Sequence, residues 1–489
     1  MKSNHWRHEK HCFEMFRMYL YYTIWNLWYY GNADNSIPKL LLISFDGFRH
    51  DYIERYNLST FKRFMENGGS AKRVKSSFAT VTFPNHFSIA TGLYEDRHGI
   101  INNQMYDPDT NETFDMNNAD TKCNWWKQNP HAVPIWIHNQ IESAQRSSGT
   151  ICWVSSQCSF KSKSPDRQIP CNGSKTATHK IDTVFQWFTN ESHPINFAAV
   201  YFNEPDNTGH EHGPNSDKMK ITLKNLEIIL DYIDTKIAES NLTQTLNVVI
   251  VSDHGMTDVY PNNSIVLCDY IDRNMYKAYG SLTVKVIFPV SEDVEPAIFR
   301  NLSFLSNYKV YRTRQLQKYH YSNNSRLGSL IIIADPGYLI FKSNISLRNS
   351  TQKGNHGYLN NVEDMHTIFM AKGPSFRPNS SIDYMKIVDI FPLLVELLKL
   401  DSHISMQISS INKFDVGSLQ TTAPLLNYVP QDHNVQPRSS TLYFLYFAMA
   451  CTILLGIVTT VGIIKAGLNM FFPGRWLLRH WTGTEDSLV

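Results

Sequence analysis

The chain has 489 residues, of which 42% are hydrophobic and 18% are charged, so it is long enough to bury one large core or two to three smaller ones. Its formal net charge is only +2 and no long basic run is present, which argues against DNA or RNA as a partner. No internal repeat and no low-complexity block interrupts the chain, so the predicted elements can be taken in order.

Residues 1–35 are predicted to be a leader. A start rich in lysine, arginine and histidine is followed by an apolar stretch over residues 18–30, which has the length of a signal-peptide core. This stretch is too short to span a bilayer comfortably. We therefore expect a signal peptide, with a short uncleaved anchor as the alternative.

The next part of the chain alternates between short, continuous apolar runs, which predict buried strands, and helical patterns. The predicted helices cover residues 219–240 and 386–398, and the predicted strands cover residues 39–45, 196–202, 246–252 and 367–371. This alternation is typical of an α/β fold with a central, mostly parallel sheet flanked by helices. We assign residues 36–404 to one domain of this class.

The last part of the chain predicts a membrane anchor. Residues 405–440 are rich in polar residues and proline, as is typical of a stalk. Residues 441–464 contain no Asp, Glu, Lys or Arg and are long enough to cross a hydrocarbon core of about 30 Å. A membrane-spanning helix therefore explains this segment better than a buried core helix or a lipid-anchor signal does. Basic residues follow, so residues 465–489 are expected in the cytoplasm of a single-pass type I plasma-membrane protein whose domain is extracellular.

Two further patterns fit an extracellular domain. Eleven acceptor motifs for N-glycans occur between the leader and the membrane segment. They begin at Asn57, Asn111, Asn172, Asn190, Asn241, Asn262, Asn301, Asn323, Asn344, Asn349 and Asn379. Five of the seven cysteines, Cys123, Cys152, Cys158, Cys171 and Cys268, lie in the same region, so up to two disulfides and one free thiol are expected, with the pairing left open.

Acidic and histidine residues lie next to the predicted strands. The motifs are SFDGF with Asp46, EPDNTGH with Asp206 and His210, SDHGM with Asp253 and His254, and GNHGY with His356. The carboxyl ends of parallel strands meet at one edge of a sheet, so these side chains are expected to converge there. Each motif alone also fits an ordinary turn or helix pair. Together they favour a divalent cation that neutralises the carboxylates, and the histidines favour zinc over calcium or magnesium.

The stretch ATVTFPNH, at residues 79–86, has a structural and a chemical interpretation. Threonine caps helices and proline is favoured in their first turn, so a helix is expected to begin near Thr82. A helix N-terminus also favours a phosphate, and a metal could activate the Thr82 hydroxyl as a nucleophile. Paired metals are the usual device for phosphoryl transfer. We treat Thr80 as structural.

These motifs resemble the ectonucleotide pyrophosphatase/phosphodiesterase family, in the alkaline phosphatase superfamily. The match runs in order through LLLISFDGFRHDY, TFPNHFSIATGLYEDRHGIINNQMYDP, EPDNTGH, VSDHGMTD, GNHGY and DMHTIFMAKGP. The resemblance implies two zinc ions. One would be held by Asp46, Thr82, Asp253 and His254, and the other by Asp206, His210 and His356.

The resemblance also implies a mechanism. Thr82 would be the nucleophile, Asn103 would donate to a phosphate oxygen, and Phe83 would stack on a nucleobase. Attack by Thr82 would give a threonine-linked nucleotidyl intermediate, and water would then release a nucleoside monophosphate. Residues 36–404 would thus be a phosphodiesterase domain of a short, single-domain type I member, because no cysteine-rich module precedes it and no nuclease-like domain follows it.

The substrate has a preferred interpretation and two alternatives. The contexts TFPNH and NNQMYDP favour hydrolysis of extracellular nucleotides or dinucleotides. The first alternative is a phospholipase C-like phosphodiesterase that acts on choline phospholipids with the same site. The second is an inactive adhesion or receptor glycoprotein, which the complete set of ligand-type residues argues against.

Overall fold

The computed structural model describes residues 37–117, 122–171, 176–260, 262–348, 350–405, 407 and 419–427. The predicted leader up to residue 36, most of the predicted stalk, the membrane segment at 441–464 and the tail lie outside these residues. Within the described residues, no helix is both long enough and apolar enough to span a bilayer.

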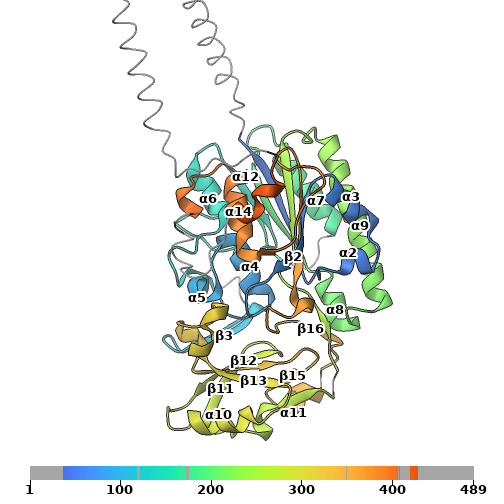
Figure 1. Ribbon diagram of the computed structural model, residues 1–489. Coiled ribbons are helices and arrows are strands. Elements are labelled where there is room, and N and C mark those ends of the chain that lie inside the picture. Colours follow the sequence, from blue (N-terminus) through green and yellow to red (C-terminus); the bar gives the residue numbers. More distant parts are fainter. Residues whose placement is uncertain are drawn as a thin grey trace, which may run out of the picture. The chain divides into compact units, whose positions relative to one another are not determined.

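A mixed sheet forms the centre of the described part (Figure 1). Its strands, in spatial order, are β18 (Ser380–Ile382), β2 (Gly69–Lys75), β17 (Thr367–Lys372), β8 (Leu246–Val251), β1 (Lys39–Phe45), β7 (Phe197–Phe202), β5 (Ser148–Ile151) and β6 (Arg167–Ile169), while β19 (Met385–Lys386) also pairs with β2. From β8 to β6 all neighbours are parallel, as the continuous apolar runs predict.

The prediction that the fourth strand is parallel is wrong. β17 pairs antiparallel with β8 on one side and with β2 on the other. The physical reason is that an unbroken apolar run reports burial on both faces of a sheet and not strand direction. The central sheet is therefore mixed.

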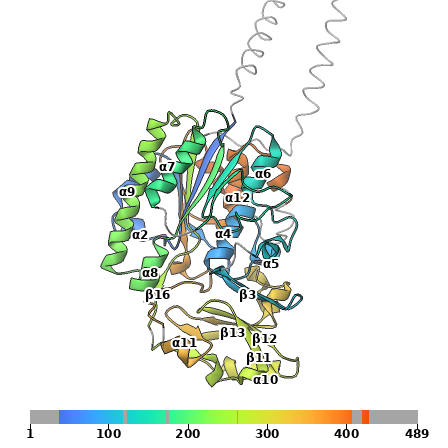
Figure 2. The same cartoon turned by 180° about the vertical axis from the view of Figure 1, so that it is seen from behind.

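Helices cover both faces of this sheet (Figures 1 and 2). One face packs against α2 (Tyr52–Arg55), α3 (Ser59–Glu66), α7 (Ala177–Phe188) and α9 (Asp217–Glu239). The other packs against α4 (Thr82–Thr91), α6 (Ile135–Glu142) and α12 (Ile390–Leu397). Strand β1 serves both layers, because Leu41 and Ile43 point into the first core and Leu40 and Leu42 into the second.

Both predicted helices form, with shifted starts. Ser216 caps α9 by accepting a hydrogen bond from Met219 N, so the helix begins two residues before its predicted start. Helix α12 begins later than predicted because residues 387–389 form a 3₁₀ turn. Apolar periodicity alone does not distinguish these two kinds of turn.

A second, smaller sheet lies between β8 and β17 in sequence and is not predicted by the sequence analysis. It is antiparallel, in the order β11 (Tyr276–Tyr279), β12 (Val284–Pro289), β14 (Leu330–Ala334) and β13 (Tyr308–Arg312). Helices α10 (Glu295–Ser303) and α11 (Asn344–Arg348) and the parallel pair β10 (Ser264–Val266) and β15 (Leu339–Phe341) complete this part, which has its own apolar core.

Short elements connect the two sheets near the carboxyl ends of the parallel strands (Figures 1 and 2). They are α5 (Glu95–His98), the hairpin β3 (Gln104–Asp107) and β4 (Glu112–Asp115), α8 (Asp206–His212), and the antiparallel pair β9 (Thr257–Asp258) and β16 (Gly354–Asn355). Helix α14 (Leu419–Thr422) is the last α-helix of the described residues.

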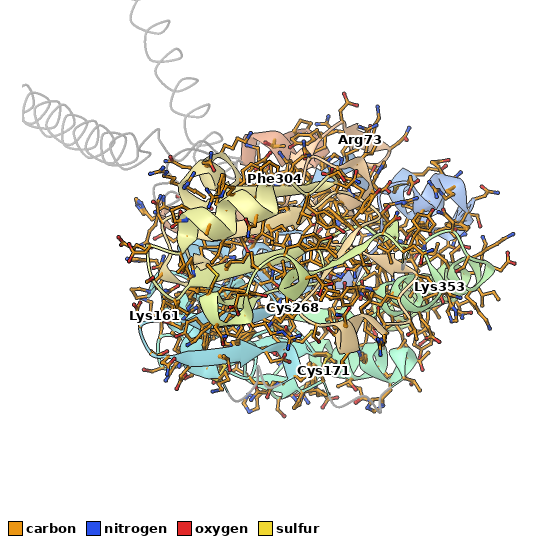
Figure 3. All side chains as sticks on the ribbon, turned by 90° about the horizontal axis from the view of Figure 1, so that it is seen from below. Arg73, Lys161, Cys171, Cys268, Phe304 and Lys353 are labelled. Carbon is orange, nitrogen blue, oxygen red and sulfur yellow. A yellow bond between two sulfur atoms is a disulfide. The ribbon has the colours of Figure 1, made fainter. Side chains whose placement is uncertain are left out.

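Among the described residues, two disulfides form and one thiol remains, as expected. Cys123 pairs with Cys158 and Cys152 pairs with Cys171. Cys268 is free and is labelled in Figure 3 together with Cys171.

Candidate metal centre

The parallel strands deliver the acidic residues to one edge of the central sheet. Asp46 follows β1 directly, Asp206 begins α8 after β7, and Asp253 lies two residues after β8. Gly47 turns the chain there with φ +68°, and a side chain at this position would place its Cβ only 2.9 Å from the Cβ of Asp206. Glycine therefore allows the β1 and β7 turns to approach each other.

The antiparallel direction of β17 explains how His356 reaches the same edge. A strand that runs opposite to its neighbours begins where they end, so the segment before β17 lies at their carboxyl ends. β16, which directly precedes His356, is held there by pairing with β9. The expected convergence therefore occurs although the predicted strand direction is wrong.

The first cluster of candidate ligands, which we call the Asp206 group, contains Asp206, His210 and His356. Asp206 and His210 are one helical turn apart on α8, and their Oδ2 and Nε2 atoms are 3.4 Å apart. His356 Nε2 lies 3.5 Å from Asp206 Oδ1 and 3.1 Å from His210 Nε2. Three ligand atoms thus face one point, as a metal requires.

The second cluster, which we call the Asp253 group, contains Asp46, Asp253 and His254, with Thr82 beside them. His254 Nε2 lies 3.0 Å from Asp253 Oδ2, 3.4 Å from Asp46 Oδ1 and 3.4 Å from Thr82 Oγ. The rings of His254 and His356 stack with centroids 3.5 Å apart, so the two groups adjoin.

The three candidate histidine ligands are held in the tautomer that a metal needs. His210 Nδ1 is 2.9 Å from Gly354 O, His254 Nδ1 is 2.9 Å from Gly255 O, and His356 Nδ1 is 2.9 Å from Thr80 O. A carbonyl oxygen can only accept, so each Nδ1 must donate. Each Nε2 therefore presents a lone pair to the centre.

The carboxylates also fit a cation. Asp46 Oδ1, Asp206 Oδ1 and Asp253 Oδ2 are buried and accept no hydrogen bond from the described residues. Burial, followed by repulsion from Asp253 and Asp206, raises the pKa of Asp46 well above its ordinary value. Three buried acceptors without donors are costly unless a cation binds them, so the residues fit a divalent metal.

His86 lies within reach of Asp46 and Asp253 but has a different role. Its Nδ1 donates to Thr82 O at 2.9 Å, and its Nε2 accepts from Ser44 Oγ at 2.8 Å. Both ring nitrogens are used, so His86 anchors α4 to β1 and positions Thr82. His86 was not predicted from the sequence as a site residue, although its i, i+4 spacing from Thr82 within α4 indicates such a contact.

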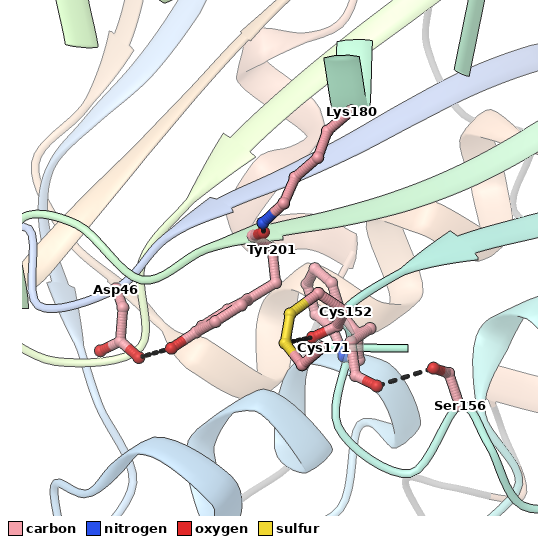
Figure 4. Close-up of a disulfide and its surroundings, with 7 residues drawn as sticks. Asp46, Cys152, Ser156, Cys171, Lys180 and Tyr201 are labelled. Carbon is pink, nitrogen blue, oxygen red and sulfur yellow. Dashed lines mark hydrogen bonds between the residues drawn. A yellow bond between two sulfur atoms is a disulfide. The ribbon is translucent and has the colours of Figure 1, made fainter. Parts of the chain in front are cut away.

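Tyr201, on β7, is a second residue that the sequence analysis missed. Its hydroxyl donates to Asp46 Oδ2 at 2.5 Å, which leaves Oδ1 for the centre (Figure 4). Lys180 Nζ donates to Tyr201 O, and the Cys152–Cys171 disulfide lies nearby in the same view. Tyr201 therefore fixes the orientation of Asp46.

Thr82 begins α4, after Val81 in extended conformation. No side chain caps this helix, so threonine does not act as the expected cap, and its hydroxyl faces the Asp253 group instead. Thr80 ties the preceding loop to the His356 segment, because its hydroxyl donates to Tyr358 O and accepts from Gly357 N. This matches its structural assignment.

Asn103 and Phe83 lie beside Thr82. The side-chain oxygen of Asn103 accepts a hydrogen bond from Phe83 N at 2.9 Å, so its NH₂ group remains as the donor toward the cavity that Asn103 lines. The partly buried ring of Phe83 packs against Phe114 and Trp126, with centroids 6.2 and 5.7 Å away. The sequence-predicted site residues are therefore all brought to one region.

Comparisons with known proteins identify the family of this chain. The sequence matches the family model described as Type I phosphodiesterase / nucleotide pyrophosphatase over residues 40–359. It is 35% identical over 369 residues to bis(5'-adenosyl)-triphosphatase enpp4 of Xenopus laevis, covering 75% of this chain and 79% of that protein. It is also 35% identical over 367 residues to ectonucleotide pyrophosphatase/phosphodiesterase family member 5 of Homo sapiens, covering 74% of each.

Solved structures of similar proteins share the fold. Human ectonucleotide pyrophosphatase/phosphodiesterase 5 superposes with a TM-score of 0.73 at 33% identity, covering 80% of this chain and all of that one. An inactive threonine-to-alanine variant of the murine protein, in complex with AMP, also gives a TM-score of 0.73, at 31% identity and with the same coverage. The chain is therefore a hydrolase that belongs to the nucleotide pyrophosphatase/phosphodiesterase family of the alkaline phosphatase superfamily.

Proposed function

We propose that this chain is a zinc-dependent ectonucleotide pyrophosphatase/phosphodiesterase that releases nucleoside monophosphates. The observation that carries the proposal is the convergence of three unpaired carboxylate oxygens and three imidazole lone pairs beside one threonine hydroxyl. One zinc is assigned to Asp46, Thr82, Asp253 and His254, and the other to Asp206, His210 and His356. Histidine and carboxylate ligands together favour zinc.

Each residue has a distinct task in the proposed reaction. Bound zinc would balance negative charge and lower the pKa of a coordinated hydroxyl. Thr82 Oγ attacks phosphorus and forms a P–O bond while the bond to the leaving group breaks. The Asn103 NH₂ group donates to a phosphate oxygen, and Phe83 supports the base. Water then attacks the same phosphorus, which frees Thr82 and releases the nucleoside monophosphate.

Nucleotide substrates are favoured over choline phospholipids by the relatives. Two of them are named for nucleotide or bis(5'-adenosyl)-triphosphate hydrolysis, and the murine structure holds AMP. The aromatic cluster around Phe83, with Phe114 and Trp126, offers apolar surface for a base next to the phosphate site.

We also propose an extracellular, membrane-anchored domain, with the boundaries predicted from the sequence. The two disulfides support an oxidising compartment. Each described glycan-acceptor asparagine is at least partly exposed, as N-glycans require. These residues are Asn57, Asn111, Asn190, Asn241, Asn262, Asn301, Asn323, Asn344 and Asn379.

The test is hydrolysis of a nitrophenyl ester of thymidine monophosphate by the full-length chain purified in detergent. Thr82→Ala is expected to lower kcat/KM at least about 1,000-fold, because the nucleophile is lost. Thr176→Ala, which removes a helix cap on α7 away from the centre, is the matched control. Retained activity in Thr82→Ala would contradict the mechanism, and faster cleavage of a choline phosphodiester would overturn the substrate assignment.

Metal removal is the companion experiment. Dialysis against a chelator is expected to abolish hydrolysis, and added zinc is expected to restore it, because the ligand set holds the ion through neutral imidazoles and carboxylates. Elemental analysis of the untreated protein should find two zinc ions per chain. A chain that binds no zinc and stays active after chelation would exclude this function.

A further inference from the structure

A cavity of about 270 Å³ adjoins only one side of the metal centre. His210 and His356, from the Asp206 group, line it together with Asn103, Ser281, Gln352 and Lys285. No residue of the Asp253 group is among the described residues that line it. The cavity therefore opens next to the Asp206 group and extends to Val81 and Asn103, which adjoin Thr82.

Lys285 is the cationic side chain of this cavity. It lies on β12 of the small sheet (Figure 1), and only 3% of its surface is exposed. Its Nζ donates one hydrogen bond, to Gly280 O at 2.8 Å, and an ammonium group has three such donors. Within the described residues, no carboxylate oxygen lies within 4.0 Å of this nitrogen.

A buried ammonium without a counterion is costly. Burial, assisted by the nearby charge of Lys342, lowers the pKa of Lys285 to about 7. An anion in the cavity would repay this cost, because it would supply both the missing charge and acceptors for the remaining N–H groups. The position therefore has the properties of a receptor for an anionic group.

The proposed reaction identifies that group. In an in-line displacement, the leaving oxygen lies opposite the attacking oxygen. Thr82 lies beside the Asp253 group, so the leaving group departs past His210 and His356 into the cavity. We propose, on the basis of the function proposed above, that Lys285 binds the first phosphate of the leaving group and so selects nucleotides linked through a pyrophosphate bond.

The chemistry is balanced without a further reactant. Attack on the α-phosphorus of diadenosine triphosphate forms the bond to Thr82 Oγ, whose proton is released to solvent, and breaks the bond to the bridging oxygen. The bridging oxygen keeps the electron pair and leaves as ADP, whose terminal phosphate meets Lys285. The cavity lies just below the usual size range of drug-sized ligand sites, so it suits a phosphate rather than the acyl chains of a lipid.

The experiment compares two substrates that differ in the leaving group. The leaving group of diadenosine triphosphate is ADP, which carries a phosphate at the broken bond. The leaving group of the nitrophenyl ester of thymidine monophosphate is nitrophenolate. In Lys285→Met, we expect the ratio of kcat/KM for the first substrate to that for the second to fall by about 10- to 100-fold, the range for a hydrogen bond to a charged group. Lys285→Arg keeps the charge and is expected to restore part of the ratio.

Lys277→Met is the matched control, because it removes the same charge from the neighbouring strand β11 at an exposed position. The control should keep the wild-type ratio. A ratio in Lys285→Met within twofold of the wild-type value would overturn the inference. If the wild-type chain cleaves neither substrate, the proposed function itself is wrong. That outcome is distinguished from failure of the Lys285 inference because it needs no variant.

Discussion

Backbone carbonyls fix the three histidines of the metal centre. In each ring Nδ1 donates to a carbonyl, of Gly354, Gly255 or Thr80, which reserves Nε2 for the centre. The ligand tautomer is therefore set by backbone carbonyls rather than by acidic partners, and for His210 and His356 these carbonyls come from distant segments of the chain.

Tyr201 offers a test at the residue scale. Tyr201→Phe removes the donor to Asp46 Oδ2 and leaves that carboxylate free to rotate. We expect a 10- to 100-fold loss of zinc affinity, which is the usual cost of losing a partner of a metal ligand, measured by competition with a chelating dye.

Tyr232→Phe is the control for this test, because its hydroxyl donates to Asp182 away from the centre. The variant should bind zinc as tightly as the wild-type protein. Unchanged zinc affinity in Tyr201→Phe would show that Asp46 does not depend on this hydrogen bond.

The candidate ligands could be predicted from the sequence, and their supporting residues could not. Asp46 and Asp253 stand out because they follow apolar strands, and strand ends in α/β folds gather at one edge. Tyr201 and Lys285 lie inside strands, where the sequence offers only side-chain alternation. Their roles depend on which neighbour faces them, which is a property of the assembled sheets.

At the scale of elements, helix α4 is held in place by buried polar contacts. Asn85 accepts hydrogen bonds from Ser77 N and Ser77 Oγ and donates to Ala79 O and Val81 O. Ser77 Oγ is also hydrogen-bonded to Glu95 at the start of α5. These contacts fix the loop that ends at Thr82, so the proposed nucleophile is positioned by a network and not by helix propensity.

Glu95 gives this network a dependence on pH. It is fully buried, and Oε2 has no partner among the described residues, so burial raises its pKa well above the ordinary value. The folded state then holds a proton that the unfolded state releases above a pH of about 4.5. Stability should therefore fall as the pH rises from that value toward the pKa of the folded state.

Glu95→Gln tests this account, because glutamine resembles the protonated acid and cannot ionise. We expect a higher Tm than wild type at pH 7.5 and a much smaller difference at pH 4.5, measured by thermal unfolding. Glu66→Gln, at an exposed position on α3, should leave both values unchanged. A lower Tm in Glu95→Gln at pH 7.5 would show that the ionised carboxylate is the stabilising form.

The direction of β17 shows what the sequence left undecided at this scale. Its apolar run predicts a buried strand in the right place, yet it runs antiparallel between β2 and β8. Strand β2, GSAKRVK, carries three basic residues and gives no apolar signal, so its pairing partner could not be recognised. The small sheet that contains β12 was missed for a related reason, since its short strands are separated by helix α10 and by 3₁₀ turns.

At the scale of the whole molecule, the proposed layout places a disulfide-linked domain outside the cell. Cys123–Cys158 closes a loop with a sequence separation of 35. The chain-entropy model gives a loss of about 3–4 kcal/mol in the free energy of unfolding when this bond is removed. Cys123→Ala with Cys158→Ala should show this loss in denaturant unfolding, and Cys268→Ala, which changes a free thiol, should not.

The anchor is tested on the same scale. Full-length protein made in animal cells should resist alkaline carbonate extraction from membranes. A chain that ends at residue 440 should instead appear in the medium, active and sensitive to an N-glycan-removing enzyme, because the predicted spanning segment at 441–464 is missing. Retention of the shortened chain in the membrane fraction would contradict this layout.

The most direct measurement of the central claim is capture of the covalent intermediate. The purified full-length chain is mixed with diadenosine triphosphate, stopped with acid within milliseconds, digested and examined by mass spectrometry. We predict that the peptide containing Thr82 carries an added adenylate, and that Thr82→Ala carries none. Turnover without an adduct on Thr82, or an adduct on another residue, would contradict the account.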